Sequence, residues 1–488
     1  MDVLKEITKP VRRKTKIIAT VGPASRNPDK VRSLIHTGVN VFRLNFSHGS
    51  HTEHLETLQT IRAVANEMQS YTAILQDLSG PKIRITNITE DYTTVKDNDT
   101  VHLRFAKEST QFSTSNEIFV EGLDPTSILK PGQPVLLADG IISLECTSVD
   151  KDKATCTVVK GNRLRSRVGI AFPDSNINLP AATEKDMVDL QWGIENGIDY
   201  AAVSFVQNAA DIRKIREAIN KAKSDIKIIA KIERKIALEN ITEIIDASDS
   251  IMVARGDLGL EFRLEQLPMI QKKIIEEANH KGKPVIVATQ MLHSMITSVR
   301  PTRAEVSDIA AAVMSGADAV MLSEETAIGE HPVESVDYLS RISAEAEKSF
   351  EYEEYKLRLR DSDHQTVPDA ISYAACAAAV KVNASAIIAC TETGNSVRLI
   401  SKYRPQQPLY GVSTKESALR RMSLVWGVIP VSCKTSSNHY DEIEVALKTV
   451  QQRENLPNGS RAVVTGGTAV SMPGSTSIME IREMIYGK

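Results

Sequence analysis

The sequence predicts an α/β protein: a (β/α)₈ TIM barrel with an inserted all-β lid domain and a C-terminal α/β domain. Three observations support this prediction. Between residues 16 and 349, eight short apolar runs are each followed by an amphipathic stretch. The interval 82–178 interrupts the series with strand-like alternation and turns. After a charged linker at 351–363, apolar runs and helical patterns alternate again.

The eight apolar runs are rich in Val, Ile or Ala, and each is short enough to be a buried strand. Three helix-starting sequences support the pairing: Asn27-Pro28, Thr183 with Asp186 three residues later, and Pro301-Thr302. Eight strand–helix pairs match a closed barrel, and a doubly wound open sheet is the alternative. The predicted strands are 16–22, 40–46, 73–78, 200–205, 226–233, 250–254, 284–289 and 317–322. The predicted helices are 28–38, 53–69, 184–196, 208–223, 235–247, 264–281, 303–315 and 332–349.

The same patterns predict where the chain divides. The interval after the third strand has turn sequences at Pro131-Gly132 and Asp139-Gly140, which are typical of an all-β domain. In the last part, strands are expected at 386–390, 408–412, 427–431 and 461–465. We therefore expect a first barrel segment at 1–81, a lid domain at 82–178, a second barrel segment at 179–350, and a linker with an α/β effector domain at 351–488.

Composition limits the classes of partner. The net charge of −3, with 25% charged residues, gives no reason to expect a nucleic-acid or membrane-surface partner. Five scattered cysteines without CxxC spacing argue against a disulfide framework or a zinc site, and fit a reducing compartment. No apolar run approaches the ~20 residues that a membrane helix needs. We expect a cytoplasmic protein.

Polar residues follow the predicted second strand. Arg43, Asn45 and Ser47 are spaced by two, so an extended chain presents them on one face. A guanidinium beside two small oxygen-bearing side chains suits an anion held next to a cation. A surface salt bridge followed by a helix cap is the alternative.

The predicted fifth and sixth strands end in charged residues. Lys231 and Glu233 share a face among isoleucines, where a buried ion pair is costly unless it is used. Gly256 allows close approach of a ligand to the backbone, and Asp257 follows it directly. Glu233 and Asp257 could hold one Mg²⁺ between them. The alternatives are an internal ion pair and a glycine turn capped by an aspartate.

Together these residues form a ring of cations, acids and hydroxyls at one end of the barrel, with Thr289 and Gln290 after the seventh strand. Carboxyl ends of barrel strands carry the catalytic groups in this fold. The ring predicts phosphate or carboxylate chemistry with a hard metal ion. Enolate chemistry on a keto acid would use the same parts, so a kinase, a metal-dependent aldolase or lyase, and a non-catalytic binding protein stay open at this point.

Seven motifs run along most of the chain in order. They are KTKIIATVGPAS (14–25), FRLNFSHGS (42–50), KIE (231–233), MVARGDLGLE (252–261), GKPVIVATQML (282–292), RPTRAEVSDIA (300–310) and AVMLSEETAIGEHP (319–332). In order and spacing they closely resemble the motifs of the pyruvate kinase family. The resemblance implies phosphoryl transfer between phosphoenolpyruvate and ADP, giving pyruvate and ATP, with Mg²⁺ or Mn²⁺. It also implies a lid that closes over the barrel mouth, and a homotetramer with allosteric control.

The resemblance assigns roles position by position. Lys231, Arg43 and Thr289 are the implied catalytic residues, and Glu233 and Asp257 are the implied Mg²⁺ ligands. The implied substrate contacts are Arg43, Ser204 and Lys231 for the phosphate and Gly256, Asp257 and Thr289 for the carboxylate. The implied nucleotide contacts are Asn45, Phe46, Ser47, His48 and Arg84.

This sequence differs from most of the family at a residue near the expected potassium site. The family's K⁺ ligands resemble Asn45, Ser47, Asp77 and the backbone of Leu78. K⁺-dependent members carry Glu where Lys82 stands, and a tethered ammonium can supply the charge of a free ion. We therefore expect K⁺ not to be required, the alternative being that Lys82 is a solvated hinge residue.

A short loop in the last part resembles the family's effector loop for phosphorylated sugars. It follows a predicted strand and precedes a helical pattern, so its N–H groups could cradle a phosphate. A plain strand–helix turn is the alternative. The loop residues are Thr391, Thr393, Gly394, Asn395 and Ser396.

Overall fold

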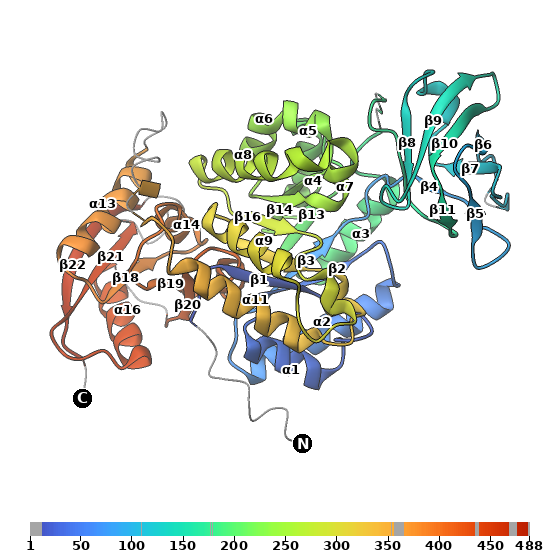
Figure 1. Ribbon diagram of the computed structural model, residues 1–488. Coiled ribbons are helices and arrows are strands. Elements are labelled where there is room, and N and C mark those ends of the chain that lie inside the picture. Colours follow the sequence, from blue (N-terminus) through green and yellow to red (C-terminus); the bar gives the residue numbers. More distant parts are fainter. Residues whose placement is uncertain are drawn as a thin grey trace.

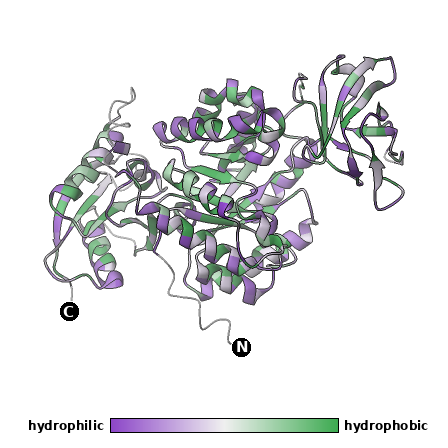
Figure 2. Cartoon of the chain, viewed as in Figure 1, coloured by the Kyte–Doolittle hydropathy of each residue, from purple (hydrophilic) through white to green (hydrophobic). Residues whose placement is uncertain are grey.

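The fold is given by a computed structural model that describes residues 12–108, 110–175, 177, 179–352, 354–355, 366–434, 439–467 and 476–486. The barrel lies between the C-terminal domain and the inserted β domain (Figure 1). Apolar residues concentrate on the barrel strands and polar residues on the outer helices (Figure 2). No helix within the described ranges is long and apolar enough to cross a membrane.

The described residues form a closed barrel of eight parallel strands in the order β1-β17-β16-β15-β14-β13-β3-β2. Closure confirms the barrel and excludes the doubly wound sheet. Val, Ile and Ala side chains fill both faces of the strands, as burial on both sides requires. The strands are β1 (Lys16–Thr20), β2 (Val41–Asn45), β3 (Ala73–Asp77), β13 (Tyr200–Val203), β14 (Lys227–Ile232), β15 (Ser250–Ala254), β16 (Val285–Ala288) and β17 (Ala319–Leu322).

The outer helices follow the predicted pattern with one break. The predicted helix 235–247 is two short helices that meet at Asn240, whose φ and ψ of −103° and 18° are not helical. The Asn240 side chain donates to the carbonyl of Gln207 at 2.9 Å, so it bonds to a neighbouring loop. The helices are α1 (Pro28–Thr37), α2 (His51–Glu67), α3 (Glu184–Glu195), α4 (Ala209–Lys221), α5 (Lys235–Glu239), α6 (Ile241–Ala247), α8 (Leu267–His280), α9 (Arg303–Met314) and α11 (Pro332–Glu347).

Two shorter helices, α7 (Arg255–Glu261) and α10 (Glu324–Ala327), directly follow strands β15 and β17. Their positions place them at the carboxyl end of the barrel. The acid Glu325 in α10 is buried and accepts hydrogen bonds from the backbone N–H groups of Leu292 at 3.0 Å and Ser323 at 2.7 Å. This carboxylate therefore fixes the loops around the mouth.

The insertion after β3 is an all-β domain, as expected. Its main sheet runs β12-β8-β9-β10-β6-β7-β4, a two-stranded sheet pairs β11 with β5, and the domain has its own apolar core. The strands are β4 (Arg84–Ile85), β5 (Thr93–Val95), β6 (Thr100–Phe105), β7 (Glu117–Glu121), β8 (Pro134–Leu137), β9 (Ile142–Val149), β10 (Ala154–Lys160), β11 (Asn162–Leu164) and β12 (Ile170–Ala171).

The C-terminal domain is a sheet in the order β20-β19-β18-β21-β22 with helices packed on it. Four strands match the prediction, and the sequence analysis missed β22 (Thr476–Met484), which pairs antiparallel with β21. Glu and Arg alternate with apolar residues in this edge strand, so the segment lacks the apolar run of a buried strand. The other elements are α13 (Val367–Lys381), β18 (Ala386–Cys390), α14 (Asn395–Lys402), β19 (Leu409–Ser413), α15 (Glu416–Met422), β20 (Val428–Ser432), α16 (His439–Glu454) and β21 (Ser460–Gly467).

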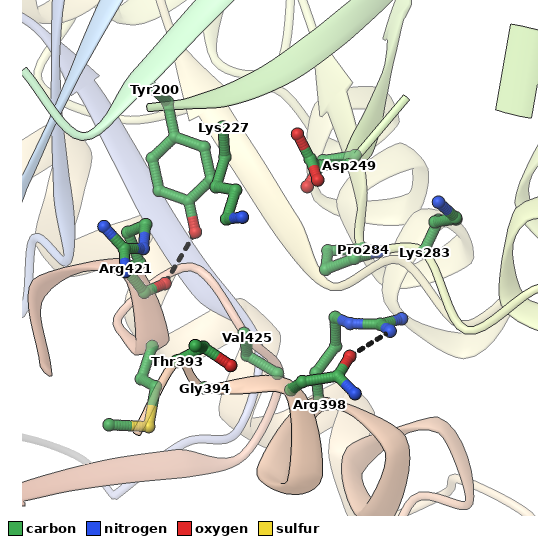
Figure 3. A pocket seen from close by; sticks show the side chains of 13 residues that line it. Tyr200, Lys227, Asp249, Lys283, Pro284, Thr393, Gly394, Arg398, Arg421 and Val425 are labelled. Carbon is green, nitrogen blue, oxygen red and sulfur yellow. Dashed lines mark hydrogen bonds between the residues drawn. The ribbon is translucent and has the colours of Figure 1, made fainter. Parts of the chain in front are cut away.

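The C-terminal domain packs against the amino-terminal ends of the barrel strands. Lys16, the first residue of β1, donates from Nζ to the carbonyl of Val428 at 2.7 Å. Tyr200, the first residue of β13, donates from its hydroxyl to the carbonyl of Arg421 at 2.6 Å (Figure 3). The carboxyl ends of the strands lie at the opposite end of the barrel, where the inserted domain is attached after β3.

Candidate active site

A buried polar cluster lies where β3, β13 and β14 end. The Lys231 ammonium lies 3.2 Å from Asp77 Oδ1, 3.0 Å from Glu233 Oε1 and 2.7 Å from Ser204 Oγ. Ser204 follows β13 directly and donates its hydroxyl to the carbonyl of Leu78 at 2.7 Å. Alternation along each strand brings these side chains to one point, since every second residue faces the same side.

Arg43 joins this cluster from β2. Its Nε donates to Asp77 Oδ2 at 2.7 Å, and its Nη1 donates to the hydroxyl of Thr20 at 3.0 Å. Asp77 thus holds Arg43 and Lys231 on its two oxygens. Sequence reasoning placed Asp77 only among K⁺ ligands and gave Thr20 no role, because their partners come from other strands.

Electrostatics keep this cluster charged. Burial raises the pKa of Asp77, but Lys231 and Arg43 outweigh burial and hold that pKa below its usual value. Burial lowers the pKa of Lys231, but Asp77 and Glu233 outweigh it and raise the pKa above the ordinary lysine value. Lys231 is therefore protonated at neutral pH, and Asp77 holds both Lys231 and Arg43 in place, where they can receive an anion.

Two carboxylates face the neighbouring space. Glu233 Oε2 accepts from the backbone N–H of Phe205 at 2.6 Å, and Asp257 Oδ1 lies 3.3 Å from the Lys82 ammonium. Burial raises the pKa of Glu233, so a cation bound there would favour its ionised form. The described residues contain no group of three or more metal-ligating His, Cys, Asp or Glu. This donor set fits Mg²⁺, which keeps water and substrate oxygens in its shell.

The turns around the mouth adopt strained backbone conformations. Thr289 has a φ of +72° and Gln290 a φ of +52°, and Phe205 has a φ of +55°. A β-branched residue at positive φ is uncommon, and such strain concentrates at functional sites. The Thr289 hydroxyl accepts from the backbone N–H of Gly256 at 2.8 Å. A substrate carboxylate at Gly256 would compete for this N–H group.

Arg255 holds the same turn. Its Nη1 lies 2.5 Å from Asp308 Oδ2, and its Nη2 donates to the carbonyl of Thr289 at 2.7 Å. The arginine between β15 and Gly256 is thus bound to the loop after β16. The sequence analysis gave Arg255 no role beyond the turn, because its partner is on α9.

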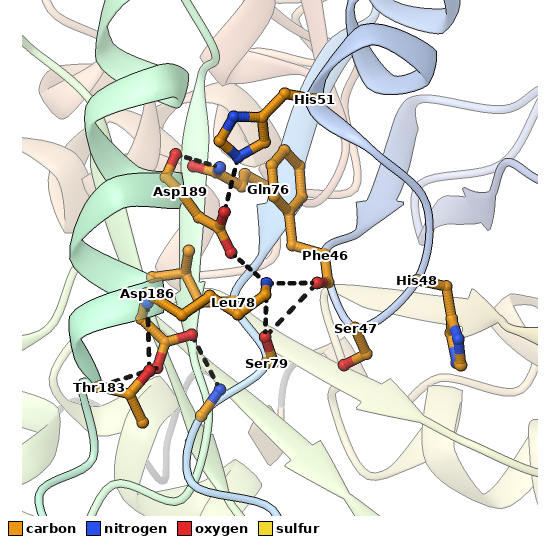
Figure 4. Close-up of polar contacts among 12 residues, drawn as sticks. Phe46, Ser47, His48, His51, Gln76, Leu78, Ser79, Thr183, Asp186 and Asp189 are labelled. Atoms are coloured by element: carbon orange, nitrogen blue, oxygen red, sulfur yellow. Dashed lines mark hydrogen bonds and ion pairs between the residues drawn. The ribbon is translucent and has the colours of Figure 1, made fainter. Parts of the chain in front are cut away.

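Side chains of α3 hold the loop of residues 45–48, which is expected to contact the nucleotide. Lys185 donates to the carbonyl of Phe46 at 2.9 Å and to the hydroxyl of Ser79 at 3.2 Å, and it pairs with Asp189 Oδ2 at 2.6 Å. His51 contacts the other oxygen of Asp189 at 2.7 Å (Figure 4). The sequence analysis missed this network, although the i,i+4 spacing of Lys185 and Asp189 was visible.

Cationic side chains lie around His48 in this loop. Burial lowers the pKa of His48, and Arg84, Arg43 and Lys82 lower it further in that order. Arg84 also donates to the carbonyl of Arg167 at 2.9 Å, which ties β4 to the end of the inserted domain. The loop therefore lies in a positive field suited to polyphosphate.

At three of the four positions that resemble the family's K⁺ ligands, the oxygens already accept hydrogen bonds or ion pairs from the chain. Asp77 binds the two cations described above, the carbonyl of Leu78 accepts from Ser204, and Asn45 Oδ1 accepts from the backbone N–H of Ser47 at 3.2 Å. Lys82 faces Asp257 and not Asp77.

The loop 391–396 is not part of this site. It lies between β18 and α14 in the C-terminal domain. The Gly394 N–H donates to the hydroxyl of Thr391 at 3.0 Å, and the buried Ser396 hydroxyl bonds to that of Thr476. The other loop residues, Thr393 and Asn395, border a cavity toward the barrel.

Two cations and three carboxylates at the carboxyl end of a (β/α)₈ barrel are the features of an enzyme that acts on an anionic substrate with a hard metal ion. Comparison with known proteins gives the particular family. The family models "Pyruvate kinase, barrel domain" and "Pyruvate kinase, alpha/beta domain" match residues 12–336 and 369–482. The chain belongs to the pyruvate kinase family and is a phosphotransferase.

Individual relatives support the same family assignment. The chain is 38% identical to a pyruvate kinase of Sporosarcina psychrophila over 96% of its length and 80% of the relative. It is 39% identical to a pyruvate kinase of Geobacillus stearothermophilus, also over 96% of this chain and 80% of that one. A crystal structure of a pyruvate kinase from Cryptosporidium parvum superposes with a TM-score of 0.90, at 35% identity and 99% coverage of both chains.

Proposed function

We propose that this chain transfers the phosphoryl group of phosphoenolpyruvate to ADP, yielding pyruvate and ATP, the last step of glycolysis, with Mg²⁺ or Mn²⁺ as cofactor. The observation that carries the proposal is the cluster of Lys231, Arg43 and Asp77 beside Glu233, in a chain of this family. The P–O bond of phosphoenolpyruvate breaks, a terminal oxygen of ADP bonds to phosphorus, and the enolate takes up a proton.

In the proposed mechanism, different residues bind the phosphate and the carboxylate of the substrate. Arg43, Ser204 and Lys231 bind the phosphate, and Lys231 neutralises charge that develops on the oxygen between phosphorus and enolate. Thr289 and the N–H groups of Gly256 and Asp257 orient the carboxylate. Orientation and charge stabilisation are most of what a protein supplies in phosphoryl transfer.

Glu233 and Asp257 would hold the divalent cation, and the cation would supply positive charge to phosphate and enolate oxygens. The nucleotide would occupy the positive field around Asn45, Phe46, Ser47, His48 and Arg84. The inserted β domain would close over the mouth and exclude water, which limits hydrolysis of the transferring group.

Potassium is not required in this proposal. Lys82 supports this view, because its ammonium already faces the Asp257 carboxylate beside the substrate space. A free ion would have to displace the internal contacts of Asp77, Leu78 and Asn45.

The proposal extends to regulation by the C-terminal domain. A phosphorylated effector would bind the loop with Thr391, Thr393, Gly394, Asn395 and Ser396, in a homotetramer. The five cysteines form no disulfide within the described residues, which fits a reducing compartment, the cytoplasm.

A coupled assay that follows pyruvate formation tests the catalytic proposal. Activity should require phosphoenolpyruvate, ADP and Mg²⁺ together. Lys231→Met should lower the rate about a thousandfold, by the scale of a lost oxyanion donor, and keep the fold. The exposed Lys272→Met on α8 is the matched control and should leave the rate unchanged. Near-normal activity of Lys231→Met would remove this residue from the mechanism.

A further inference from the structure

A cavity of about 130 Å³ lies between the barrel and the C-terminal domain. Tyr200, Lys227 and Ser250, the first residues of β13, β14 and β15, line it on the barrel side. Gly394, the N-cap of α14, and Arg398 within α14 line it on the side of the C-terminal domain (Figure 3). This interdomain cavity is thus at the end of the barrel opposite the active site.

The charges around the interdomain cavity are unbalanced. Four cationic side chains line it, Lys227, Lys283, Arg398 and Arg421, against one carboxylate, Asp249. The Asp249 carboxylate already has other partners. Its Oδ2 pairs with Arg216 at 2.5 Å and accepts from the backbone N–H of Ile228 at 2.8 Å.

The cations have few anionic partners of their own. Within the described ranges, Lys227 makes no side-chain hydrogen bond or ion pair. Among the described residues, Lys283 donates to the carbonyl of Ser248 alone. Arg398 donates to a backbone carbonyl and to the Asn395 amide oxygen, so both cations bind neutral acceptors.

Arg421 adds positive charge on the same side of the cavity as Tyr200 and Lys227. It pairs through Nη1 with Asp225 at 2.6 Å, and the residue is 6% exposed. Its guanidinium is therefore partly neutralised by Asp225, and it contributes to the field in the cavity without being a free donor.

Burial and the excess of positive charge both lower the pKa values of the two lysines that line the cavity. Burial, followed by the charge of Arg398, lowers the pKa of Lys283 to about 8. Burial likewise lowers the pKa of Lys227, where the attraction of Asp249 is opposed by Arg421 and Arg216. A dianion in the cavity would relieve both the desolvation and the repulsion.

We propose that the interdomain cavity binds a compact phosphate monoester through Lys227, Lys283 and Arg398. A phosphate offers several acceptor oxygens to these cationic side chains, which a monovalent anion of similar size would satisfy less well. The start of α14 adds a favourable dipole on the same wall. This site uses barrel residues, so it is separate from a phosphate held within the loop 391–396 alone.

Binding here would tie the C-terminal domain to the barrel. Lys227 begins β14, the strand that carries Lys231 at its other end. Lys283 immediately precedes Pro284 and β16, which leads to Thr289. The ligand therefore bridges one domain to the strands that carry the active site of the other, and it should raise the unfolding temperature of the full chain.

Calorimetric titration with glycerol 1-phosphate tests the site, in an Arg43→Gln background that weakens phosphate binding at the barrel mouth. The Lys227→Gln,Lys283→Gln variant should bind about tenfold or more weakly, because it loses two charge-assisted contacts. Lys227→Gln alone removes no side-chain hydrogen bond or ion pair among the described residues, and it should also weaken binding. Lys272→Gln, which removes an exposed cation, is the matched control and should change nothing.

Neutral glycerol should not bind, and inorganic phosphate should bind and compete. Equal affinity in the cavity variants and the control would overturn the proposal, as would binding of glycerol with similar affinity or no binding of phosphate at all. These titrations measure no turnover, so their outcome is independent of whether the catalytic proposal holds.

Discussion

Replacing Lys82 with glutamate reverses a charge next to the substrate space. The Lys82 ammonium lies 3.3 Å from Asp257 Oδ1, and the two side chains are 32% and 25% exposed. Lys82→Glu would place two carboxylates where an ion pair stood. We therefore expect the variant to need an external cation, which the proposed mechanism of the unmodified chain does not require.

The geometry gives the size of the effect. Two unit charges at this separation interact by about 5 kcal/mol at an effective dielectric constant of about 20. Partial exposure screens the pair, so we take about half of this value as the net cost. A cost of about 2.5 kcal/mol corresponds to an activity about 70-fold lower.

The assay is turnover in K⁺-free buffer, with a tetraalkylammonium salt keeping ionic strength constant. The unmodified enzyme should have near-full activity, and Lys82→Glu should lose most of it and regain part when K⁺ is added. Lys82→Met, which removes the charge without reversing it, should be intermediate. Strong K⁺ activation of the unmodified enzyme would refute the reasoning, as would a Lys82→Glu variant with normal K⁺-free activity.

Three further predictions follow from the structure. Glu233→Gln and Asp257→Asn should each raise the Mg²⁺ concentration needed for half-maximal activity, because each removes fixed negative charge from the metal site, and unchanged metal curves for both would exclude this carboxylate pair. Burial, followed by the charge of Arg13, lowers the pKa of Lys16 to about 7, so between pH 7 and about 10 the unfolded chain holds more protons and stability rises with pH. In Lys16→Met the unfolding temperature should therefore rise less between pH 7 and pH 9, and parallel curves would contradict this. Ser396→Asp should abolish activation by a phosphorylated effector, because it adds negative charge to the proposed loop, and an unchanged response in enzyme kinetics would favour a plain turn.

The barrel was predictable because its strands are local apolar runs. Each of the eight strands lies within a predicted range, since burial on both faces leaves only apolar residues in the run. The break at Asn240 depends on a bond to the Gln207 carbonyl, which no local pattern reveals. The edge strand β22 has one exposed face and charged residues, so periodicity alone did not separate it from other elements.

The site was predictable to the extent that strand ends carry its residues. Lys231, Glu233 and Arg43 were named because polar residues at these positions are unusual in a packed barrel. Their pairing through Asp77 was not predictable, because it depends on which strands are neighbours. The contact of Lys82 with Asp257 joins residues 175 positions apart, and it required the folded chain.

Phosphorus NMR of a single reaction mixture tests the central claim most directly. With phosphoenolpyruvate, ADP, Mg²⁺ and the unmodified enzyme, the phosphoenolpyruvate signal should fall as the γ-phosphate signal of ATP rises by an equal amount. The same mixture with Lys231→Met should remain unchanged over that time. Release of inorganic phosphate in place of ATP, or a stable phosphoenolpyruvate signal with the unmodified enzyme, would contradict the account.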